Sequence, residues 1–349
     1  MIFSKKKIRV AINGFGRIGR AFLKIAWERP DIEIVAINDL GTLESLTYLL
    51  KHDTVYRTWD RSVAHDGKNL LVDGKTVTFV SEKDTTKLPW KELGIDVVVE
   101  STGLFTAYDK AKFHLDQGAK KVVITAPAKD GDLAGAEAVK GATILMGVNE
   151  NQFGTCDITS NASCTTNAAS PLIGIMDEAI GIEKAILNTV HGYTASQALV
   201  DGPSKKDLRE GRAAAMNIVP ASTGAAIAVT KAYPQLDNLF DGISIRVPVV
   251  AGSIVDVTFI AKRDTTVEEV NEALKKAAKD PRWMKVFTVT DEPLVSSDIL
   301  GNTHASIADL EMTRVVGGNL VKVMAWYDNE WGYTASLVEH VVATGKLIK

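Results

Sequence analysis

The stretch I-R-V-A-I-N-G-F-G-R-I-G, residues 8–19, decides the fold of this 349-residue chain. Its first five residues are mostly apolar and predict a buried parallel strand. The segment A-F-L-K-I-A-W at 21–27 has the apolar spacing of a helix, and I-E-I-V-A-I at 32–37 predicts a second strand that ends in Asn38 and Asp39. A glycine-rich turn between a strand and a helix, with an acidic residue after the next strand, predicts a dinucleotide-binding βαβ unit.

Each residue of this motif has a physical role in the dinucleotide hypothesis. Gly14 permits the tight turn, Gly16 lets the backbone approach a pyrophosphate, and Gly19 lets helix and strand pack closely. The N–H groups at the start of the helix attract the phosphates. Asp39 can accept hydrogen bonds from the adenosine ribose, and its charge disfavours an additional phosphate there, so NAD is favoured over NADP. The alternatives are a glycine turn without a ligand and a turn or capping role for Asp39.

Further short apolar runs at 77–80, 96–100 and 121–125 extend the pattern of parallel strands. A chain of this length exceeds one ordinary core, so we expect two domains. The Gly/Ala-rich segment 129–142 is predicted to be a surface insertion and receives no function.

Composition argues against a nucleic-acid-binding, a disulfide-rich, a secreted or a membrane-spanning protein. A formal net charge of -3 argues against nucleic acid as the main partner. The chain has two cysteines, too few for a disulfide framework and suited to a reducing compartment. Lys5, Lys6 and Lys7 resemble the start of a signal peptide, but Arg9 and Asn13 interrupt the apolar core that a signal peptide needs next. No apolar run reaches the length of a membrane span. We therefore expect a cytoplasmic globular protein that does not bind a membrane.

The segment S-N-A-S-C-T-T-N, residues 160–167, places Cys164 among small polar residues just before a predicted helix. A thiol at a helix N-terminus has its thiolate favoured, so a lowered pKa is expected. Cys156 lies near a predicted strand and is interpreted as a small buried apolar residue. A thiol nucleophile needs a base, and His191 is a candidate because it follows an apolar run and opens H-G-Y-T. Spacing alone does not show that the two residues meet.

Six strings occur in an order that resembles the phosphorylating glyceraldehyde-3-phosphate dehydrogenases. They are N-G-F-G-R-I-G-R, S-N-A-S-C-T-T-N, H-G-Y-T, P-A-S-T-G-A-A (220–226), R-V-P (246–248) and W-Y-D-N-E-W-G-Y (326–333). The likeness extends from about Ile8 to Glu339. The cysteine string and W-Y-D-N-E are specific to that family, whereas the glycine motif is shared with others.

The resemblance implies an α/β fold with two domains. A Rossmann-type NAD-binding domain would occupy residues 1–163 and be completed by a C-terminal helix at 330–349. An α+β catalytic domain with a mainly antiparallel sheet would occupy residues 164–329. The long loop at 201–212 resembles a segment that in relatives lies against the cofactor of a neighbouring subunit, which implies a homotetramer; a flexible basic loop in a monomer is the alternative.

The resemblance also implies a reaction, the oxidation of D-glyceraldehyde 3-phosphate to 1,3-bisphosphoglycerate with NAD+ and inorganic phosphate. Cys164 would attack the aldehyde to give a hemithioacetal, while His191 takes the thiol proton and later polarises the reacting oxygen. Hydride transfer to NAD+ would leave a thioester, which inorganic phosphate cleaves to an acyl phosphate. No metal is implied.

The remaining site residues are carried over by the same likeness. The cofactor contacts would be Gly14, Gly16, Arg17, Ile18, Gly19, Asp39, Lys83, Thr125 and Asn329. The phosphate of the substrate would be held by Thr194 and Arg246. The attacking phosphate would meet Ser163, Thr165, Thr223 and Gly224. Lys83 could instead belong to a solvated turn, Thr223 and Gly224 to a loop that opens a helix, and Arg246 to an exposed strand.

The sequence departs from the family at three positions. Ala168 replaces a second cysteine that relatives often carry, so a disulfide between that position and the nucleophile is excluded. Ser196 and Glu210 stand where many bacterial relatives have aspartate and arginine, and a negative Glu210 could weaken the phosphate site.

Two other functions fit parts of the pattern. One is oxidation of another phosphorylated sugar aldehyde, such as erythrose 4-phosphate, with hydrolysis of the thioester; the two phosphate-site strings argue against hydrolysis. The other is a non-catalytic nucleotide- or RNA-binding protein. The presence of both Cys164 and His191, and the acidic net charge, argue against it.

Overall fold

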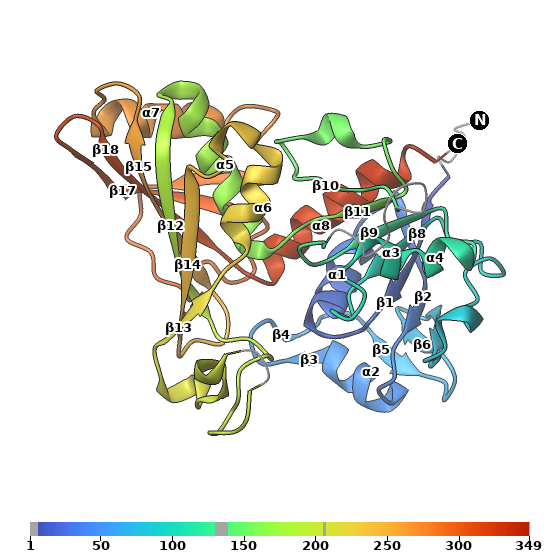
Figure 1. The fold of residues 1–349 in the computed structure, drawn as a ribbon. Coiled ribbons are helices and arrows are strands. Elements are labelled where there is room, and N and C mark those ends of the chain that lie inside the picture. The colour runs from blue at the N-terminus through green and yellow to red at the C-terminus, as the bar shows by residue number, and fades with distance from the viewer. Residues whose placement is uncertain (1–5, 130–138, 205–206, 349) are drawn as a thin grey trace. The chain divides into compact units, whose positions relative to one another are not determined.

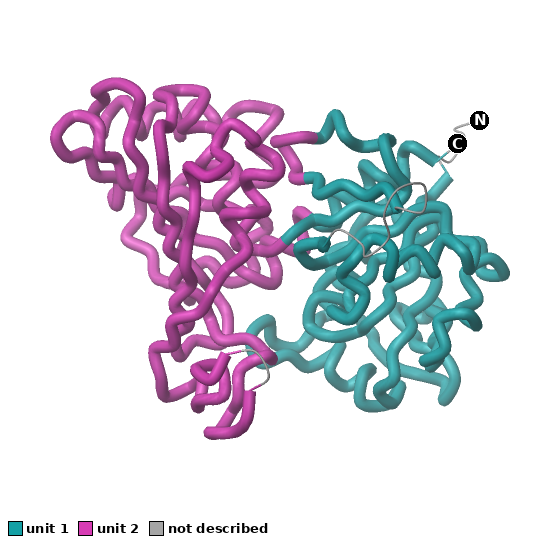
Figure 2. The backbone as a smooth tube through the Cα atoms, in the orientation of Figure 1, with its two compact units in different colours: residues 1–144, 150–162, 337–349 teal, residues 145–149, 163–336 magenta. Residues whose placement is uncertain are grey.

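The computed structural model describes residues 6–129, 139–204 and 207–348, and most of the predicted insertion at 129–142 lies outside these residues. The chain forms two compact units, coloured separately in Figure 2. Unit 1 comprises Met1–Ile144, Glu150–Ala162 and Leu337–Lys349, and unit 2 comprises Leu145–Asn149 and Ser163–Ser336.

Unit 1 is built on a nine-stranded sheet with the order β10-β11-β9-β8-β1-β2-β7-β6-β5 (Figure 1). All neighbours from β10 to β7 pair in parallel, and β6 and β5 continue as an antiparallel edge. The strands are β1 (Ile8–Asn13), β2 (Ile32–Asn38), β5 (Val63–His65), β6 (Leu70–Val72), β7 (Lys75–Val80), β8 (Val97–Glu100), β9 (Lys121–Ile124), β10 (Gly141–Thr143) and β11 (Ile158–Ser160).

The helices of this unit cover apolar strands. They are α1 (Arg17–Trp27), α2 (Leu43–Lys51), α3 (Tyr108–Ala111), α4 (Phe113–Asp116) and the part of α8 (Trp331–Gly345) from residue 337 onward, beside a small hairpin of β3 (His52–Asp53) and β4 (Arg57–Thr58). One core cluster joins Val10 and Ile12 of β1, Phe22 of α1, and Leu337 and Val341 of α8. The C-terminal segment therefore completes the core of unit 1, although most of that core comes from the N-terminal third of the chain.

The glycine turn joins β1 to α1 by two close backbone approaches. Gly14 has a φ of +94°, in the region that favours glycine, and a Cβ there would lie 2.6 Å from the backbone nitrogen of Thr102. A Cβ on Gly19 would lie 2.2 Å from the carbonyl oxygen of Gly14. Both positions therefore require glycine for packing, whereas a Cβ on Gly16 would meet no atom within 4 Å.

Unit 2 is built on a seven-stranded sheet with the order β13-β14-β12-β15-β18-β17-β16. Four of its six strand pairs are antiparallel, and β12–β14 and β16–β17 are parallel. The strands are β12 (Ile182–Gly192), β13 (Val219–Ser222), β14 (Phe240–Val247), β15 (Ser253–Ala261), β16 (Phe287–Thr290), β17 (Ser306–Val316) and β18 (Leu320–Tyr327), and the helices are α5 (Cys164–Ala179), α6 (Ala225–Ala232) and α7 (Val267–Ala277). The predicted combination of a parallel dinucleotide-binding sheet and a mainly antiparallel second sheet is confirmed.

Helix α5 covers the sheet of unit 2 and is in contact with β12, β15, β17 and β18. It is buried along most of its length, from Thr165 to Met176. Among the described residues, none of the helices is long and apolar enough to cross a membrane.

The surroundings of Gly19 and Gly16 predict different effects of alanine on the free energy of unfolding. Gly19→Ala should lower the free energy of unfolding by about 2 kcal/mol or more, because the new methyl group meets backbone that cannot rotate away. Gly16→Ala should change the free energy of unfolding by less than about 0.5 kcal/mol, since its φ of -69° suits alanine and the space is open. Denaturant unfolding of both variants is the measurement, and equal stability of the two would contradict the packing role of Gly19.

Candidate functional site

A cavity of about 470 Å³ lies in unit 1 at the carboxyl ends of the parallel strands. Its lining includes four residues that the sequence predicted to bind the dinucleotide, namely Gly14, Gly16, Asp39 and Lys83. Loops that follow β1, β2, β7 and β8 form its walls. Ligands of open parallel sheets bind at this edge.

The glycine turn leaves room for an anionic ligand. The backbone at Gly16 is open, and no side chain caps the N-terminus of α1. A helix start with accessible backbone N–H groups attracts a pyrophosphate. The Asp39 carboxylate is held by the N–H groups of Phe15 and Gly41, each at 2.7 Å, so it faces the cavity as a fixed acceptor. These features fit a dinucleotide.

The other predicted cofactor residues of unit 1 do not line this cavity. Arg17 forms an ion pair with Asp53 at 3.0 Å, and Ile18 packs against the core. Thr125 follows β9, and its N–H donates to the carbonyl of Glu100 at 3.0 Å. Their roles toward a cofactor remain predictions.

Strand register assembles a second cluster, in unit 2. His191 of β12 lies opposite Arg246 of β14 on one side and Ser253 of β15 on the other, and Ser253 lies opposite Tyr327 of β18. Residues in one row of a sheet project from the same face. Helix α5 packs on β12, β15 and β18 and begins at Cys164, which brings the thiol to this row.

Cys164 and His191 are in hydrogen-bond contact. The distance from Cys164 Sγ to His191 Nε2 is 3.3 Å, across 27 residues of chain. The Ser163 hydroxyl caps α5 by accepting a hydrogen bond from the Thr166 N–H at 3.1 Å, which fixes the start of the helix. The two side chains that the resemblance pairs are therefore in contact in the folded chain, and their roles as nucleophile and base stay predictions.

Two neighbours compete for the other ring nitrogen of His191. Nδ1 lies 2.6 Å from the carbonyl oxygen of Gly192, which can only accept a hydrogen bond and so favours a proton on Nδ1. Arg246 Nη1, a donor, also lies 2.6 Å from Nδ1, and it donates to the same carbonyl at 3.4 Å. With the guanidinium turned to that carbonyl or to a bound anion, the proton resides on Nδ1 and Nε2 can take the thiol proton.

Burial and Arg246 set the protonation states of this pair. Burial, together with the positive charge of Arg246, lowers the pKa of His191 to about 3. Burial raises the pKa of the Cys164 thiol, although Arg246 and the hydrogen bonds from Thr165 oppose this. The expectation that the helix N-terminus lowers the pKa of this thiol was therefore wrong, because desolvation outweighs the local field. A neutral thiol beside a neutral imidazole needs that imidazole to accept its proton during attack.

Tyr327 is a site residue that the sequence reasoning missed. Its buried hydroxyl lies 2.9 Å from Thr165 Oγ1 and 2.7 Å from Thr189 Oγ1. Its ring meets that of His191 edge-on, with the centroids 5.8 Å apart. Tyr327 belongs to the W-Y-D-N-E string, but nothing in the string indicates that its hydroxyl joins α5 to β12.

The predicted phosphate ligands are spread over several elements of unit 2. Thr194 Oγ1 lies 3.1 Å from Ser196 Oγ, just beyond β12. Thr223 Oγ1 accepts a hydrogen bond from the Ala225 N–H at 3.2 Å, and Gly224 caps α6 with open space around its α-carbon. The Thr165 hydroxyl is already bonded to Tyr327. Arg246 lies directly against His191, and Thr165 is hydrogen-bonded to the Cys164 thiol.

Asn329 and Glu210 occupy well-defined positions. Asn329 Oδ1 accepts hydrogen bonds from the Gly252 N–H at 3.0 Å and from the Ser253 hydroxyl at 3.2 Å, so its Nδ2 group is left to donate. Glu210 is half-buried, and its backbone carbonyl accepts from the Ala198 N–H at 3.1 Å.

Within the described ranges, no group of three or more His, Cys, Asp or Glu side chains could hold a metal ion.

Comparison with known proteins identifies the family. The family model described as "Glyceraldehyde 3-phosphate dehydrogenase, NAD binding domain" matches residues 8–108, and the model of the C-terminal domain of the same family matches residues 163–329. The chain is 46% identical over 341 residues to a glyceraldehyde-3-phosphate dehydrogenase of Streptomyces coelicolor, with 97% of this chain and 98% of that one covered. It is 46% identical over 345 residues to glyceraldehyde-3-phosphate dehydrogenase 2 of Bacillus subtilis, with the same coverage of 97% and 98%.

A fungal relative is almost as similar. Glyceraldehyde-3-phosphate dehydrogenase 1 of Candida glabrata is 45% identical over 342 residues, which cover 97% of this chain and 99% of that one. The resemblance inferred from the six strings is thus confirmed over nearly the whole chain. The chain belongs to the glyceraldehyde 3-phosphate dehydrogenase family and is an NAD-dependent oxidoreductase.

Proposed function

We propose that the chain oxidises D-glyceraldehyde 3-phosphate to 1,3-bisphosphoglycerate, with NAD+ and inorganic phosphate as co-substrates, in the glycolytic or the reverse direction. The observation that carries the proposal is the 3.3 Å contact between Cys164 Sγ and His191 Nε2. Arg246, in the same row, adds a fixed positive charge beside this pair. A nucleophile, a base and an anion-binding group therefore converge.

In the first half-reaction, Cys164 Sγ attacks the aldehyde carbon and its proton passes to His191 Nε2. The protonated Nε2 then donates to the oxygen of the hemithioacetal. NAD+, when bound, supplies the hydride acceptor, and loss of hydride from the former aldehyde carbon leaves a thioester on Cys164. His191 removes the hydroxyl proton as the carbonyl re-forms.

In the second half-reaction, an oxygen of inorganic phosphate attacks the thioester carbon. The carbon–sulfur bond breaks, the acyl phosphate leaves, and Sγ departs as a thiolate that recovers a proton. We assign the attacking phosphate to Ser163, Thr165, Thr223 and the backbone of Gly224. Thr223 supports this assignment because its hydroxyl accepts a hydrogen bond from the Ala225 N–H and keeps its own proton to donate.

We assign the substrate's own phosphate to Thr194 and Arg246. A guanidinium recognises phosphate through paired donors, and neighbouring hydroxyls complete an anion site. Ser196 lies beside Thr194 and adds a second hydroxyl without adding negative charge. Glu210, in contrast, would reduce the affinity if its carboxylate turned toward the phosphate.

We assign NAD to Gly14, Gly16, Arg17, Ile18, Gly19, Asp39, Lys83 and Thr125, with Asn329 holding the nicotinamide carboxamide. The open backbone at Gly16 and the fixed carboxylate of Asp39 support the assignment for the pyrophosphate and the ribose. The Nδ2 group of Asn329, whose Oδ1 is already held by the protein, suits a carboxamide oxygen.

We further propose a cytoplasmic homotetramer. Large apolar side chains near the 201–212 loop are unusually exposed, among them Leu199 at 81%, Leu208 at 86% and Met216 at 82%. Large apolar side chains that are this exposed support association with other copies of the chain. Cys156 and Cys164 are both free thiols, which suits a reducing compartment.

NADH formation from glyceraldehyde 3-phosphate tests the function directly. Turnover should require both the aldehyde and inorganic phosphate, and erythrose 4-phosphate should be a poorer substrate. Turnover that continues at the same rate without phosphate would indicate hydrolysis of the thioester and would overturn the proposal.

Removing the nucleophile should abolish turnover while preserving the fold. Cys164→Ser should lower kcat by about 10³-fold or more, because serine is a far weaker nucleophile beside the same base. The measurement is the rate of NADH formation at saturating substrates.

The matched control for this variant is Cys156→Ser. The Cys156 thiol is buried and donates to the carbonyl of Ile158 at 3.2 Å, a bond that serine can also make. Its activity should stay close to that of the wild type. Similar losses of activity in both variants would indicate misfolding instead of a lost nucleophile.

Arg246→Leu should change both substrate binding and the pH profile. We expect KM for the phosphorylated aldehyde to rise about tenfold or more, because charge-assisted hydrogen bonds are lost. Losing the positive charge should also let the pKa of His191 rise above about 3. Protonated His191 cannot accept the thiol proton, so the acid limb of kcat should move to higher pH.

Arg246→Lys separates these two effects. Lysine keeps a positive charge near His191 but lacks the paired donors, so KM should rise while the acid limb stays low. Unphosphorylated glyceraldehyde is the matched substrate, and its KM should change little in either variant. An unchanged acid limb and an unchanged KM in Arg246→Leu would exclude both roles.

A further inference from the structure

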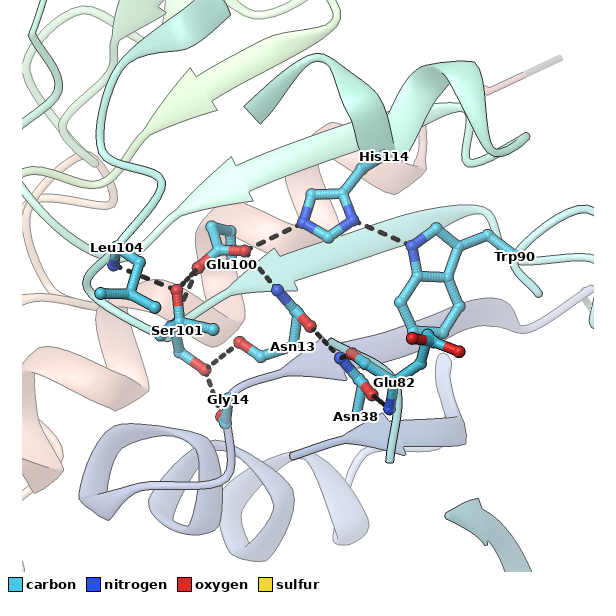
Figure 3. A network of polar contacts seen from close by, with 10 residues as sticks. Asn13, Gly14, Asn38, Glu82, Trp90, Glu100, Ser101, Leu104 and His114 are labelled. Carbon is cyan, nitrogen blue, oxygen red and sulfur yellow. Dashed lines mark hydrogen bonds and ion pairs between the residues drawn. The ribbon is translucent and has the colours of Figure 1, made fainter. Parts of the chain in front are cut away.

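A row of buried polar side chains crosses the carboxyl edge of the unit 1 sheet (Figure 3). Glu100 ends β8, Asn13 ends β1 and Asn38 ends β2, and the three are register partners in neighbouring strands. Asn13 Nδ2 donates to Glu100 Oε2 at 2.6 Å, and Asn38 Nδ2 donates to Asn13 Oδ1 at 2.8 Å. The side chains thus form a continuous line of hydrogen bonds perpendicular to the strands.

Glu100 stands at one end of this row, and donors occupy both of its carboxylate oxygens. Its Oε1 accepts from both the backbone N–H and the hydroxyl of Thr102, and its Oε2 accepts from Asn13 and from His114 Nε2 at 2.9 Å. The side chains of Glu100 and His114 are exposed by only 1% and 0%. Four donors to one buried carboxylate offset the loss of water.

The indole of Trp90 decides how His114 is protonated. Trp90 Nε1 lies 2.9 Å from His114 Nδ1 and can only donate, so Nδ1 must be an acceptor. The ring proton is therefore on Nε2 and points at Glu100. Burial lowers the pKa of His114, which agrees with a neutral ring. Trp90 and His114 together hold the carboxylate in one orientation.

The other end of the row reaches the loop after β7. Asn38 Nδ2 also donates to the carbonyl of Glu82 at 3.1 Å, and Asn38 Oδ1 accepts from the Glu82 N–H at 2.9 Å. Thr102 in turn accepts a hydrogen bond on its hydroxyl from the Leu104 N–H at 3.1 Å. The row therefore connects the loops that follow four adjacent strands.

These loops form the wall of the 470 Å³ cavity, whose lining includes Asn13, Asn38, Glu82, Thr102 and Leu104. Neither Glu100 nor His114 lines it. We propose that His114 and Glu100 are positioning residues for the adenosine half of NAD, acting through Asn13, Asn38 and Thr102. The inference rests on the proposed function, in which Asp39, a cavity-lining residue, holds the ribose of the adenosine.

A purely structural role does not require this row. Apolar packing of similar volume often stabilises a core as well as a buried charged network does, even where hydrogen bonds offset the loss of water. Asn13 and Asn38 of the row line the cavity, as does Thr102, which is bonded to Glu100, and adjacent Asp39 is the predicted ribose ligand. Its geometry is therefore accounted for by the need to hold four loops in one arrangement before the cofactor binds.

His114→Leu tests the proposal, with His114→Gln as the conservative partner. Leucine removes both hydrogen bonds, whereas a glutamine amide can accept from Trp90 with its oxygen and donate to Glu100 with its nitrogen. We expect the Kd of NAD, measured by calorimetry on the full-length enzyme, to rise about tenfold in His114→Leu and to stay within about threefold of wild type in His114→Gln. KM for NAD should follow Kd, while kcat and KM for the aldehyde change less than about twofold.

His340→Leu is the matched control for lost stability. His340 is another buried histidine of unit 1, bonded to Thr159 at 2.7 Å, and it does not line the cavity. The His340→Leu substitution should lower Tm without changing the Kd of NAD. Trp90→Phe provides a second test if His114→Leu fails to fold, and it should raise Kd because Nδ1 is no longer held as an acceptor.

An unchanged Kd in His114→Leu or in Trp90→Phe, with wild-type enzyme binding NAD normally, would overturn the positioning role. So would equal changes in Kd for His114→Leu and His340→Leu, because the effect would then follow stability alone. Failure of the wild-type enzyme to bind NAD or to oxidise the aldehyde would instead contradict the proposed function, so the two failures are distinguishable.

Discussion

Strand register is the constraint on which both sites depend. In unit 2, Arg246, His191, Ser253 and Tyr327 occupy one row across four strands, and α5 delivers Cys164 to that row. In unit 1, Glu100, Asn13 and Asn38 occupy one row at the edge that opens on the cavity. A slip of one residue turns a side chain to the opposite face of its sheet. One such slip in β12 would separate the base from the thiol, however intact both residues were.

Desolvation dominates the electrostatics of these rows. His191 is buried beside a guanidinium and remains neutral, which keeps Nε2 available as a proton acceptor well below neutral pH. The same burial disfavours the thiolate of Cys164 until a base removes the proton. In the proposed mechanism the pair becomes charged only while the carbon–sulfur bond forms, when negative charge moves onto the substrate. In unit 1 the carboxylate of Glu100 remains buried because hydrogen-bond donors occupy both of its oxygens.

Local pattern predicts the elements but not their partners. The β1–α1–β2 unit and the start of α5 at Cys164 follow from apolar spacing, glycines and a serine cap, all of which act within a few residues. The parallel pairing of β12 with β14 joins residues 55 positions apart, and only this pairing sets Arg246 against His191. The pKa of Cys164 illustrates the same limit. The helix N-terminus could be read from the sequence, but the burial that outweighs it depends on how the folded chain packs around the thiol.

His191 and His114 show how the hydrogen-bonding group beside Nδ1 decides which ring nitrogen carries the proton. At His191 a carbonyl next to Nδ1 favours the proton there once Arg246 donates elsewhere, and Nε2 then faces the thiol as an acceptor. At His114 an indole N–H occupies Nδ1, so the proton is forced onto Nε2, which faces a carboxylate as a donor. An acceptor beside Nδ1 holds the ring proton there, so Nε2 can act as a base. A donor beside Nδ1 leaves the proton on Nε2, which then donates a hydrogen bond. The sequence around each histidine does not predict this difference, because the deciding groups are the carbonyl of Gly192 and the indole of Trp90. Their orientation in the folded chain distinguishes the histidine that we propose to react from the one that we propose to position other residues.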